Sequence, residues 1–141
     1  MRLLIAVLVL LTLTTRAMAG CDTPPAPNSD PTSEELRAAM EIAGAKTQLR
    51  GVYAVAPDCM PGSRLGFYDG RGLILLADDW RRVGGLTRLV HELRHHYQHE
   101  NGLPIDECDA TEVASKWADE NDYINEARRE RGYGAAECVG S

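Results

Sequence analysis

The residues best suited to chemistry lie in one short stretch, His91-Glu92-Leu93-Arg94-His95. Two histidines four positions apart lie one turn apart on the same face of a helix, so both imidazoles can reach one metal ion. The glutamate beside the first histidine can then take a proton from a water molecule at that ion. The pattern predicts one zinc ion bound by His91 and His95, with Glu92 as the general base.

The neighbouring residues predict the helix that this pattern requires. Proline and glycine do not occur between Leu86 and Tyr97, and apolar residues recur there at helical spacing. On such a helix the two histidines project from the side opposite Leu93. We therefore expect one side of the helix to pack on a core while the histidines face a cleft. A metal-free helix with a polar face would carry the same residues.

Three further polar residues lie in the same stretch. His96 and His99 are expected to be exposed polar residues rather than metal ligands. Gln98 lies on the ligand side of the helix, where it either forms a hydrogen bond near the site or is solvated.

A catalytic zinc ion needs a third protein ligand as well as an open position for water. A histidine six positions after His95 is one solution, but Asn101 occupies that position. The helix expected after Asp106 carries Glu107 on its inward side, where a charge requires a partner or a metal ion. We predict Glu107 as the third ligand, with Asp109 as the alternative. Both carboxylates could instead simply place negative charge at the start of a helix.

These two segments resemble the gluzincin-type zinc metallopeptidases, in particular small bacterial members of that group. The resemblance rests on His91–Gln98 and Glu107–Ala110 and covers roughly residues 86–118. It implies a compact α+β peptidase in which the two histidines and Glu107 bind zinc and Glu92 is catalytic. The chain is too short for the second subdomain that closes the cleft in larger gluzincins.

One position departs from the family pattern. Many relatives carry Asp or Asn directly after the alanine of the second motif, whereas this chain has Thr111. The contact expected from that position to a ligating histidine is therefore weakened.

The activity implied by the resemblance is hydrolysis of peptide bonds in a peptide or protein, with water activated by zinc and Glu92 as the base. The oxyanion of the tetrahedral intermediate needs a further donor, and the candidates are Tyr97, His99, Tyr123 and Tyr133. The alternative is an exported zinc-binding or protein-interaction domain without catalytic activity. Zinc would then be structural, and His99 or Asp109 would have to supply a fourth ligand.

The rest of the chain predicts an α+β fold that is mostly helical, with a small sheet or hairpin before the metal-binding helix. A capping box that begins at Thr32 starts a helix reaching about Leu49. Asp69-Gly70 lies between two apolar runs and predicts a hairpin. The runs that predict strands are residues 51–55, 65–68 and 73–76.

Two helices are expected in the last third of the chain. The first is capped by Asp106 and reaches about Asn121, and the second continues from there to Arg131. Gly132 and Gly134 are expected to end the second helix. The remaining tail is expected to be irregular and to be held by a disulfide.

The N-terminal residues predict export. Residues 1–19 combine a basic start, an apolar run and small residues before a cleavage point, as is typical of a secretory signal peptide. Residues 20–31 are rich in proline and predict a linker, which leaves residues 32–141 as the metallopeptidase domain. Ala19-Gly20-Cys21 also resembles the end of a lipobox. A lipid anchor at Cys21 therefore stays open, although the residues before it favour simple secretion.

Cysteine content and net charge limit the cellular compartments and the partner classes that fit this chain. Four cysteines in an exported domain predict two disulfides, for which three connectivities are possible. The net charge of −6 becomes −8 if Arg2 and Arg16 are removed with the signal peptide. This charge argues against nucleic acid and anionic lipid as main partners. We expect a periplasmic or extracellular protein without stable membrane insertion, unless Cys21 is lipidated; its oligomeric state is open.

Overall fold

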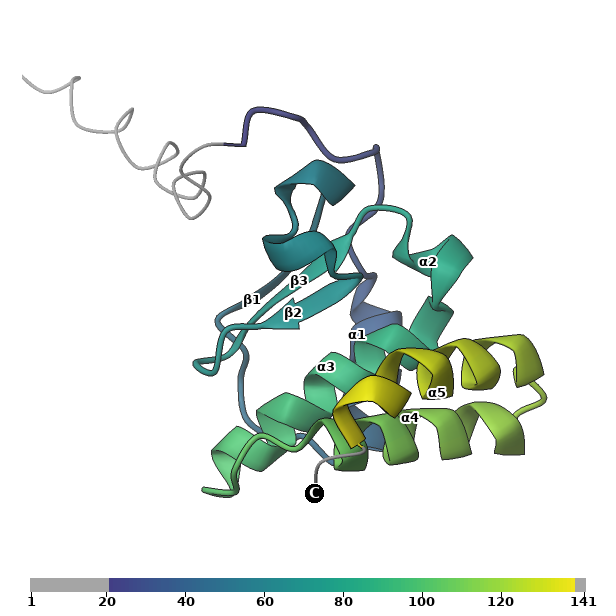
Figure 1. Cartoon of the computed structure of the whole chain (residues 1–141). Helices are drawn as coiled ribbons and strands as arrows, with labels where there is room; N and C mark the ends of the chain where they lie inside the picture. The colour runs from purple at the N-terminus through teal and green to yellow at the C-terminus, as the bar shows by residue number, and fades with distance from the viewer. Residues whose placement is uncertain (1–20, 139–141) are drawn as a thin grey trace, which may run out of the picture.

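The computed structural model describes residues 21–138, so the predicted signal peptide lies outside the described residues. The described chain forms a small α+β domain that is mostly helical, and this confirms the predicted fold class. Figure 1 shows a small sheet at one side of the molecule and the longer helices packed beside it. In chain order the elements are α1 (Ser33–Ala43), β1 (Gly51–Val55), the 3-10 turns η1 (Pro57–Cys59) and η2 (Pro61–Ser63), β2 (Gly66–Tyr68), β3 (Leu73–Ala77), α2 (Trp80–Val83), α3 (Gly85–Glu100), α4 (Glu107–Glu120) and α5 (Ile124–Cys138).

The sheet has three strands in the order β1-β3-β2. The predicted hairpin joins β2 to β3 in antiparallel pairing, whereas β1 pairs with β3 in parallel. Gly70 adopts a positive φ of 75° in the turn, and the Asp69 carboxylate accepts hydrogen bonds from two backbone N–H groups, of Arg71 and Leu73. Because the order places β2 at an edge of the sheet, its outer side is available to face the helices.

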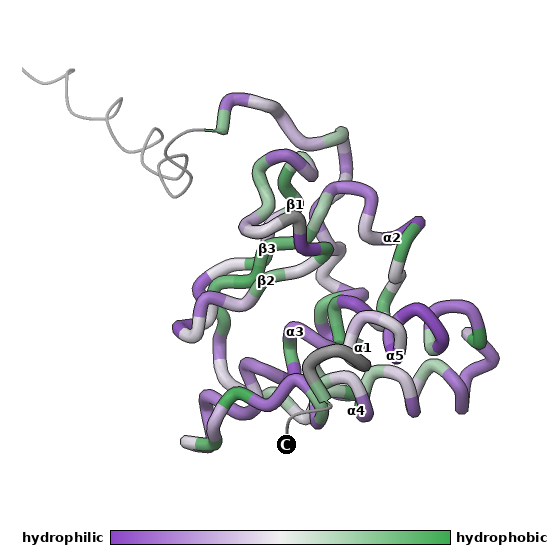
Figure 2. Tube along the Cα trace, viewed as in Figure 1, coloured by the Kyte–Doolittle hydropathy of each residue, from purple (hydrophilic) through white to green (hydrophobic). Residues whose placement is uncertain are grey.

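The helix α3 is the centre of the fold, since it contacts the sheet and the three other long helices. Its predicted apolar stripe is buried against Ile74, Leu76 and Trp80 in the main core. The histidine side is buried as well, with His91 only 4% exposed and His95 only 3% exposed. Figure 2 shows mostly hydrophobic colouring on β3 and mostly hydrophilic colouring on α5. Both sides of α3 therefore lie in the interior, one in an apolar core and one in a polar site.

The helix α1 begins as predicted and ends earlier than predicted. Thr32 forms the full capping box with Glu35. The helix ends at Gly44, which is left-handed with φ 78°, rather than near Leu49. The backbone N–H groups of Lys46 and Thr47 donate to the Glu100 carboxylate of α3 instead of continuing the helix. A long-range partner thus replaces the local hydrogen bonds that helix periodicity predicts.

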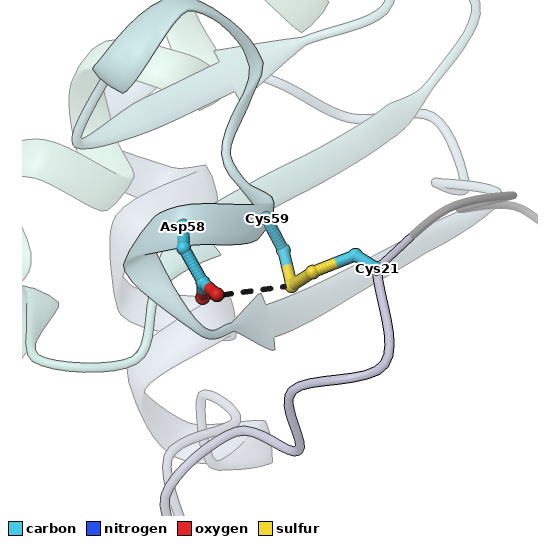
Figure 3. A group of neighbouring side chains, drawn as sticks. All are labelled: Cys21, Asp58 and Cys59. Carbon is cyan, nitrogen blue, oxygen red and sulfur yellow. Dashed lines mark hydrogen bonds between the residues drawn. A yellow bond between two sulfur atoms is a disulfide. The ribbon is translucent and has the colours of Figure 1, made fainter.

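The described part of the predicted linker lies against the folded domain. Trp80 donates its indole N–H to the carbonyl of Ser29 at 2.7 Å, and Ala54 donates its N–H to the Asp30 carboxylate. A disulfide joins Cys21 to Cys59 in η1, as Figure 3 shows. The composition of this segment is that of a flexible arm, but these partners fix it to the sheet and to α2.

The last helix differs from the prediction. Instead of ending at Gly132, α5 continues through Gly134 to Cys138, and the tail that we expected to be irregular is helical as far as Cys138. A Cβ atom on Gly134 would overlap the Thr111 side chain, so the absence of a side chain lets α5 lie very close to α4. The disulfide from Cys108 to Cys138 holds the last turn in place. Here tertiary contacts override the low helix propensity of glycine.

The cysteines confirm the prediction of two disulfides and select one of the three connectivities. Disulfides are typical of oxidising, exported compartments. Among residues 21–138, no helix combines the length and the apolar character that crossing a bilayer requires.

Candidate metal centre

Three ligand atoms from two helices meet at one point. His91 and His95 come from the middle of α3, and Glu107 is the first residue of α4. The two Nε2 atoms lie 3.1 Å apart. One Glu107 oxygen lies 3.0 Å from Nε2 of His91, and the other lies 3.3 Å from Nε2 of His95. The structure thus brings together the three residues that the sequence proposes as zinc ligands, and this group could hold a metal ion.

The spacing of these atoms fits a small cation. In a tetrahedral zinc site with ligand distances of about 2.0–2.1 Å, ligand atoms lie roughly 3.3 Å apart. The other ring nitrogens are also occupied: Nδ1 of His91 lies 2.5 Å from Glu130, and Nδ1 of His95 lies 3.1 Å from the Gln98 side-chain oxygen. When each Nδ1–H donates to these oxygens, both Nε2 lone pairs face the carboxylate of Glu107. Three acceptors that face one another require a shared positive charge.

The pKa values of the metal-free site express the same requirement. Burial alone opposes a charge on His91, but hydrogen bonds to Glu107 and Glu130 outweigh it and raise the pKa of His91 to about 9. Burial likewise opposes a charge on His95, but the hydrogen bonds to Glu107 and Gln98 and the charge of Glu92 together raise its pKa. Hydrogen bonds from His91 and then His95 hold the pKa of Glu107 well below its usual value. A metal ion bound by these atoms would therefore displace protons from the histidines.

The alternative ligand, Asp109, lies outside the group of ligand atoms. Its carboxylate accepts hydrogen bonds from Arg94 at 2.6 and 3.0 Å and from the Gln98 amide at 2.8 Å. Gln98 in turn accepts from His95 and from the backbone N–H of Asp106. Gln98 is therefore buried and bonded rather than solvated, and Asp109 orients a ligand through it.

The proposed general base lies in the same cavity as the three ligand residues. Glu92 is only 3% exposed, and its carboxylate lies against Gly66 of β2 so closely that a Cβ atom there would overlap it. Arg88, one turn earlier on α3, lies 3.6 Å from the Glu92 carboxylate. The absence of a side chain at residue 66 therefore makes the space that Glu92 occupies.

The cavity has a volume of about 600 Å³ and lies between the sheet and the helices. One wall is the edge strand β2 with the turns around it, and the other is formed by α3, α4 and α5. The half-exposed side chains of Ile105 and Tyr133 contribute apolar surface to its lining. A ligand of several residues in extended form has room in a cavity of this size.

Only one of the four predicted oxyanion donors lines this cavity. Tyr133 does so, whereas Tyr97 lies under the Arg94 guanidinium and Tyr123 stacks on Trp117 at the protein surface. His99 is exposed, as predicted, and is not among the residues that line the cavity.

Two residues of the site were not predicted from the sequence. Glu130 lies 39 positions after His91 on α5, and its carboxylate lies 2.5 Å from Nδ1 of His91. Tyr68 of β2 lines the cavity, and its hydroxyl lies 3.1 Å from Nδ1 of His96. Burial raises the pKa of Tyr68, so this hydroxyl keeps its proton. Because the stretch before Gly132 contains no Pro or Gly, the sequence indicated that Glu130 lies on a helix. It contained no signal for the contact of Glu130 with His91.

His96 also corrects a prediction, because it is buried rather than exposed. Its Nε2 lies 3.0 Å from the Thr47 hydroxyl and 3.9 Å from a Glu100 oxygen. The side chain thus joins α3 to the segment after α1, away from the ligand atoms.

A second group of possible ligands, Cys21, Asp58 and Cys59, lies at the N-terminal segment. Both sulfur atoms belong to one disulfide, with Asp58 beside them in Figure 3. Disulfide sulfur is not a thiolate ligand, so this group serves as a cross-link.

Comparison of the chain with protein-family models, curated proteins and solved structures gives no match.

Proposed function

We propose that this protein is a zinc-dependent metallopeptidase of the gluzincin type. The observation that carries the proposal is the convergence of two Nε2 atoms and the Glu107 carboxylate at 3.0–3.3 Å, with the Glu92 carboxylate in the same cavity. In the described part of the chain, neither His99 nor Asp109 joins this group. Three protein ligands with a further position open to solvent are typical of catalytic zinc, whereas structural zinc has four.

The chain supplies the remaining parts of a hydrolytic reaction. Bound zinc would act as a Lewis acid that polarises the scissile carbonyl and lowers the pKa of water toward ~7. Glu92 accepts a proton from the attacking water and passes it to the leaving amine. Tyr133 is the candidate among those predicted that can donate to the developing oxyanion, because it lines the cavity.

The edge strand β2 suggests how a substrate lies in the cavity. Its inner side pairs with β3 in the order β1-β3-β2, and residues 66–68 line the cavity. An extended peptide can add to such an edge through backbone hydrogen bonds. We therefore propose an unfolded peptide or a protein segment as the substrate.

The proposed location is the periplasm or the extracellular space, with residues 1–19 removed as a signal peptide. The disulfide of Cys21 with Cys59 supports simple secretion, because a Cys21 sulfur that carries a lipid could not form it. Mass spectrometry of the exported protein distinguishes a mature chain with two disulfides from a lipidated one.

The decisive test is Glu92→Gln, which keeps the shape of the side chain and removes its basicity. We expect the variant to bind zinc as the wild type does and to lose peptide hydrolysis by a factor of about 100 or more. Zinc content is measured by elemental analysis and activity with a fluorogenic peptide library. Zinc-saturated Glu92→Gln with wild-type turnover would exclude the assignment of the base.

A further inference from the structure

A buried arginine lies between two carboxylates of the site. Arg88 of α3 is one turn before His91, and its side chain is 9% exposed. Nη2 lies 2.9 Å from Glu130, and Nη1 lies 3.6 Å from Glu92. The Tyr133 ring covers the guanidinium carbon at 5.4 Å. One side chain thus reaches both α5 and the proposed base.

These contacts continue to a metal ligand. The other oxygen of Glu130 lies 2.5 Å from Nδ1 of His91. A continuous chain of polar contacts therefore runs from His91 through Glu130 and Arg88 to Glu92. All four side chains are buried. Charges in such a setting are costly unless they are paired, so each member constrains the position of the next.

We propose that Arg88 is a positioning residue, which fixes Glu92 relative to the metal ligands by holding Glu92 and Glu130 with one guanidinium. The inference rests on the proposed function. A guanidinium has donors in a planar fork and can serve two carboxylates at once, which the single ammonium group of lysine does less well. Arg88 acts through its neighbours and does not itself take part in proton transfer.

The two carboxylates beside Arg88 argue against a substrate-binding role for its guanidinium. Two carboxylates, of Glu92 and Glu130, already face the single positive charge of Arg88. A substrate carboxylate that approached this guanidinium would meet both of them. The arginine therefore belongs to the frame of the site and does not serve as an anion subsite.

The first test measures kcat and KM of Arg88→Gln and Arg88→Lys, both saturated with zinc, on the peptide that the wild type cleaves best. We expect kcat of Arg88→Gln to fall about 10- to 100-fold with KM little changed, because the base is misplaced while the substrate contacts remain. The loss in Arg88→Lys should be smaller. Arg131→Gln is the matched control, since Arg131 follows Glu130 and pairs with Asp119 at the surface. It should behave as the wild type.

Three results of this test would overturn the inference. An unchanged kcat with a lower Tm would show a structural ion pair only. An increased KM with an unchanged kcat would show a substrate-binding arginine. If kcat fell less than twofold in both Arg88→Lys and Arg88→Gln, the planar fork of the guanidinium would not be needed. If Arg88→Gln does not fold, Arg88→Lys decides.

The second test requires no catalysis. Zinc dissociation constants are measured by chelator competition for Arg88→Gln, Glu130→Gln and the double variant. Because Arg88 reaches the ligand only through Glu130, the double variant should lose little more affinity than Glu130→Gln alone. Additive losses would overturn the inference while the wild type stays active. A wild type without peptidase activity would instead overturn the proposed function, and with it the link to Glu92.

Discussion

At the scale of single residues, the site depends on where each carboxylate and each glycine lies. Glu107 and Asp109 are two positions apart at the start of α4, yet the first faces the histidines and the second faces Arg94 and Gln98. The first would touch the metal ion, and the second would only orient His95.

This difference predicts unequal effects of the same chemical change. Glu107→Gln removes a charged ligand, so zinc affinity should fall more than about 100-fold, beyond the range found for outer partners. Asp109→Asn should cost about 10-fold, because Gln98 keeps its contact with His95. Both constants follow from competition with a chromophoric chelator. A larger loss of zinc affinity in Asp109→Asn than in Glu107→Gln would mean that Asp109, and not Glu107, is the third ligand.

Gly66 predicts an effect on catalysis without an effect on metal binding. A methyl group in Gly66→Ala would overlap the Glu92 carboxylate and force it to move. Since a displacement of about 1 Å can cost up to about 100-fold, we expect kcat to fall strongly while zinc content stays at the wild-type level. The same preparation supplies both measurements. Wild-type kcat in this variant would mean that Glu92 acts from another position.

At the scale of elements, the arrangement of α4 and α5 determines whether Glu130 reaches His91. Gly134 allows the close approach of the two helices, and the Cys108–Cys138 disulfide closes their free ends. Of the two glycines that signal a helix end in the sequence, Gly134 is therefore a packing residue, whereas Gly132 meets no neighbouring atom.

Two substitutions in α5 should have opposite effects. Gly134→Ala would overlap Thr111, push α5 outward and weaken both stability and zinc affinity. Gly132→Ala meets no neighbouring atom and should stabilise the helix by about 0.5–1 kcal/mol. Thermal unfolding and chelator competition on the two variants provide the comparison. A Gly134→Ala variant as stable as Gly132→Ala would show that the two helices can separate without cost.

Local sequence signals predicted the elements better than their assembly. The capping box at Thr32, the turn at Asp69-Gly70 and the cap at Asp106 are local, and each is observed. The parallel pairing of β1 with β3 and the contact of Glu130 with His91 join distant residues. Periodicity and turn residues contain no signal for such contacts. The motif of α3 therefore identified the candidate ligands, but the support behind them came only from the fold.

At the scale of the whole molecule, one ion pair joins three separate segments. Arg81 of α2 donates to both oxygens of Glu35 in α1 at 2.8 and 2.7 Å, and to carbonyls of the N-terminal segment. These hydrogen bonds from Arg81, aided by Thr32, lower the pKa of Glu35 to about 2. The segment before α1 is thus attached to the domain by a charged group that titrates in acid.

The shift predicts a loss of stability in acid. The lowered pKa of Glu35 contributes stability that is fully present above pH 4.5 and is lost as the pH falls through about 2. Glu35→Gln should therefore lower Tm at neutral pH, and the difference from the wild type should disappear near pH 2. The effect is modest, because both side chains are about one-third exposed. Glu34→Gln, at an exposed neighbouring position, serves as the control; an equal pH profile for both variants would contradict the prediction.

The two disulfides lie on opposite sides of the cavity. One fastens the N-terminal segment to η1 beside the sheet, and the other fastens α4 to α5. Among the described residues, neither bond bridges the β2 wall and the helical wall, so the main chain and noncovalent contacts, such as that of the Tyr68 hydroxyl with His96, set the width between them. A change in this width would consequently break neither disulfide.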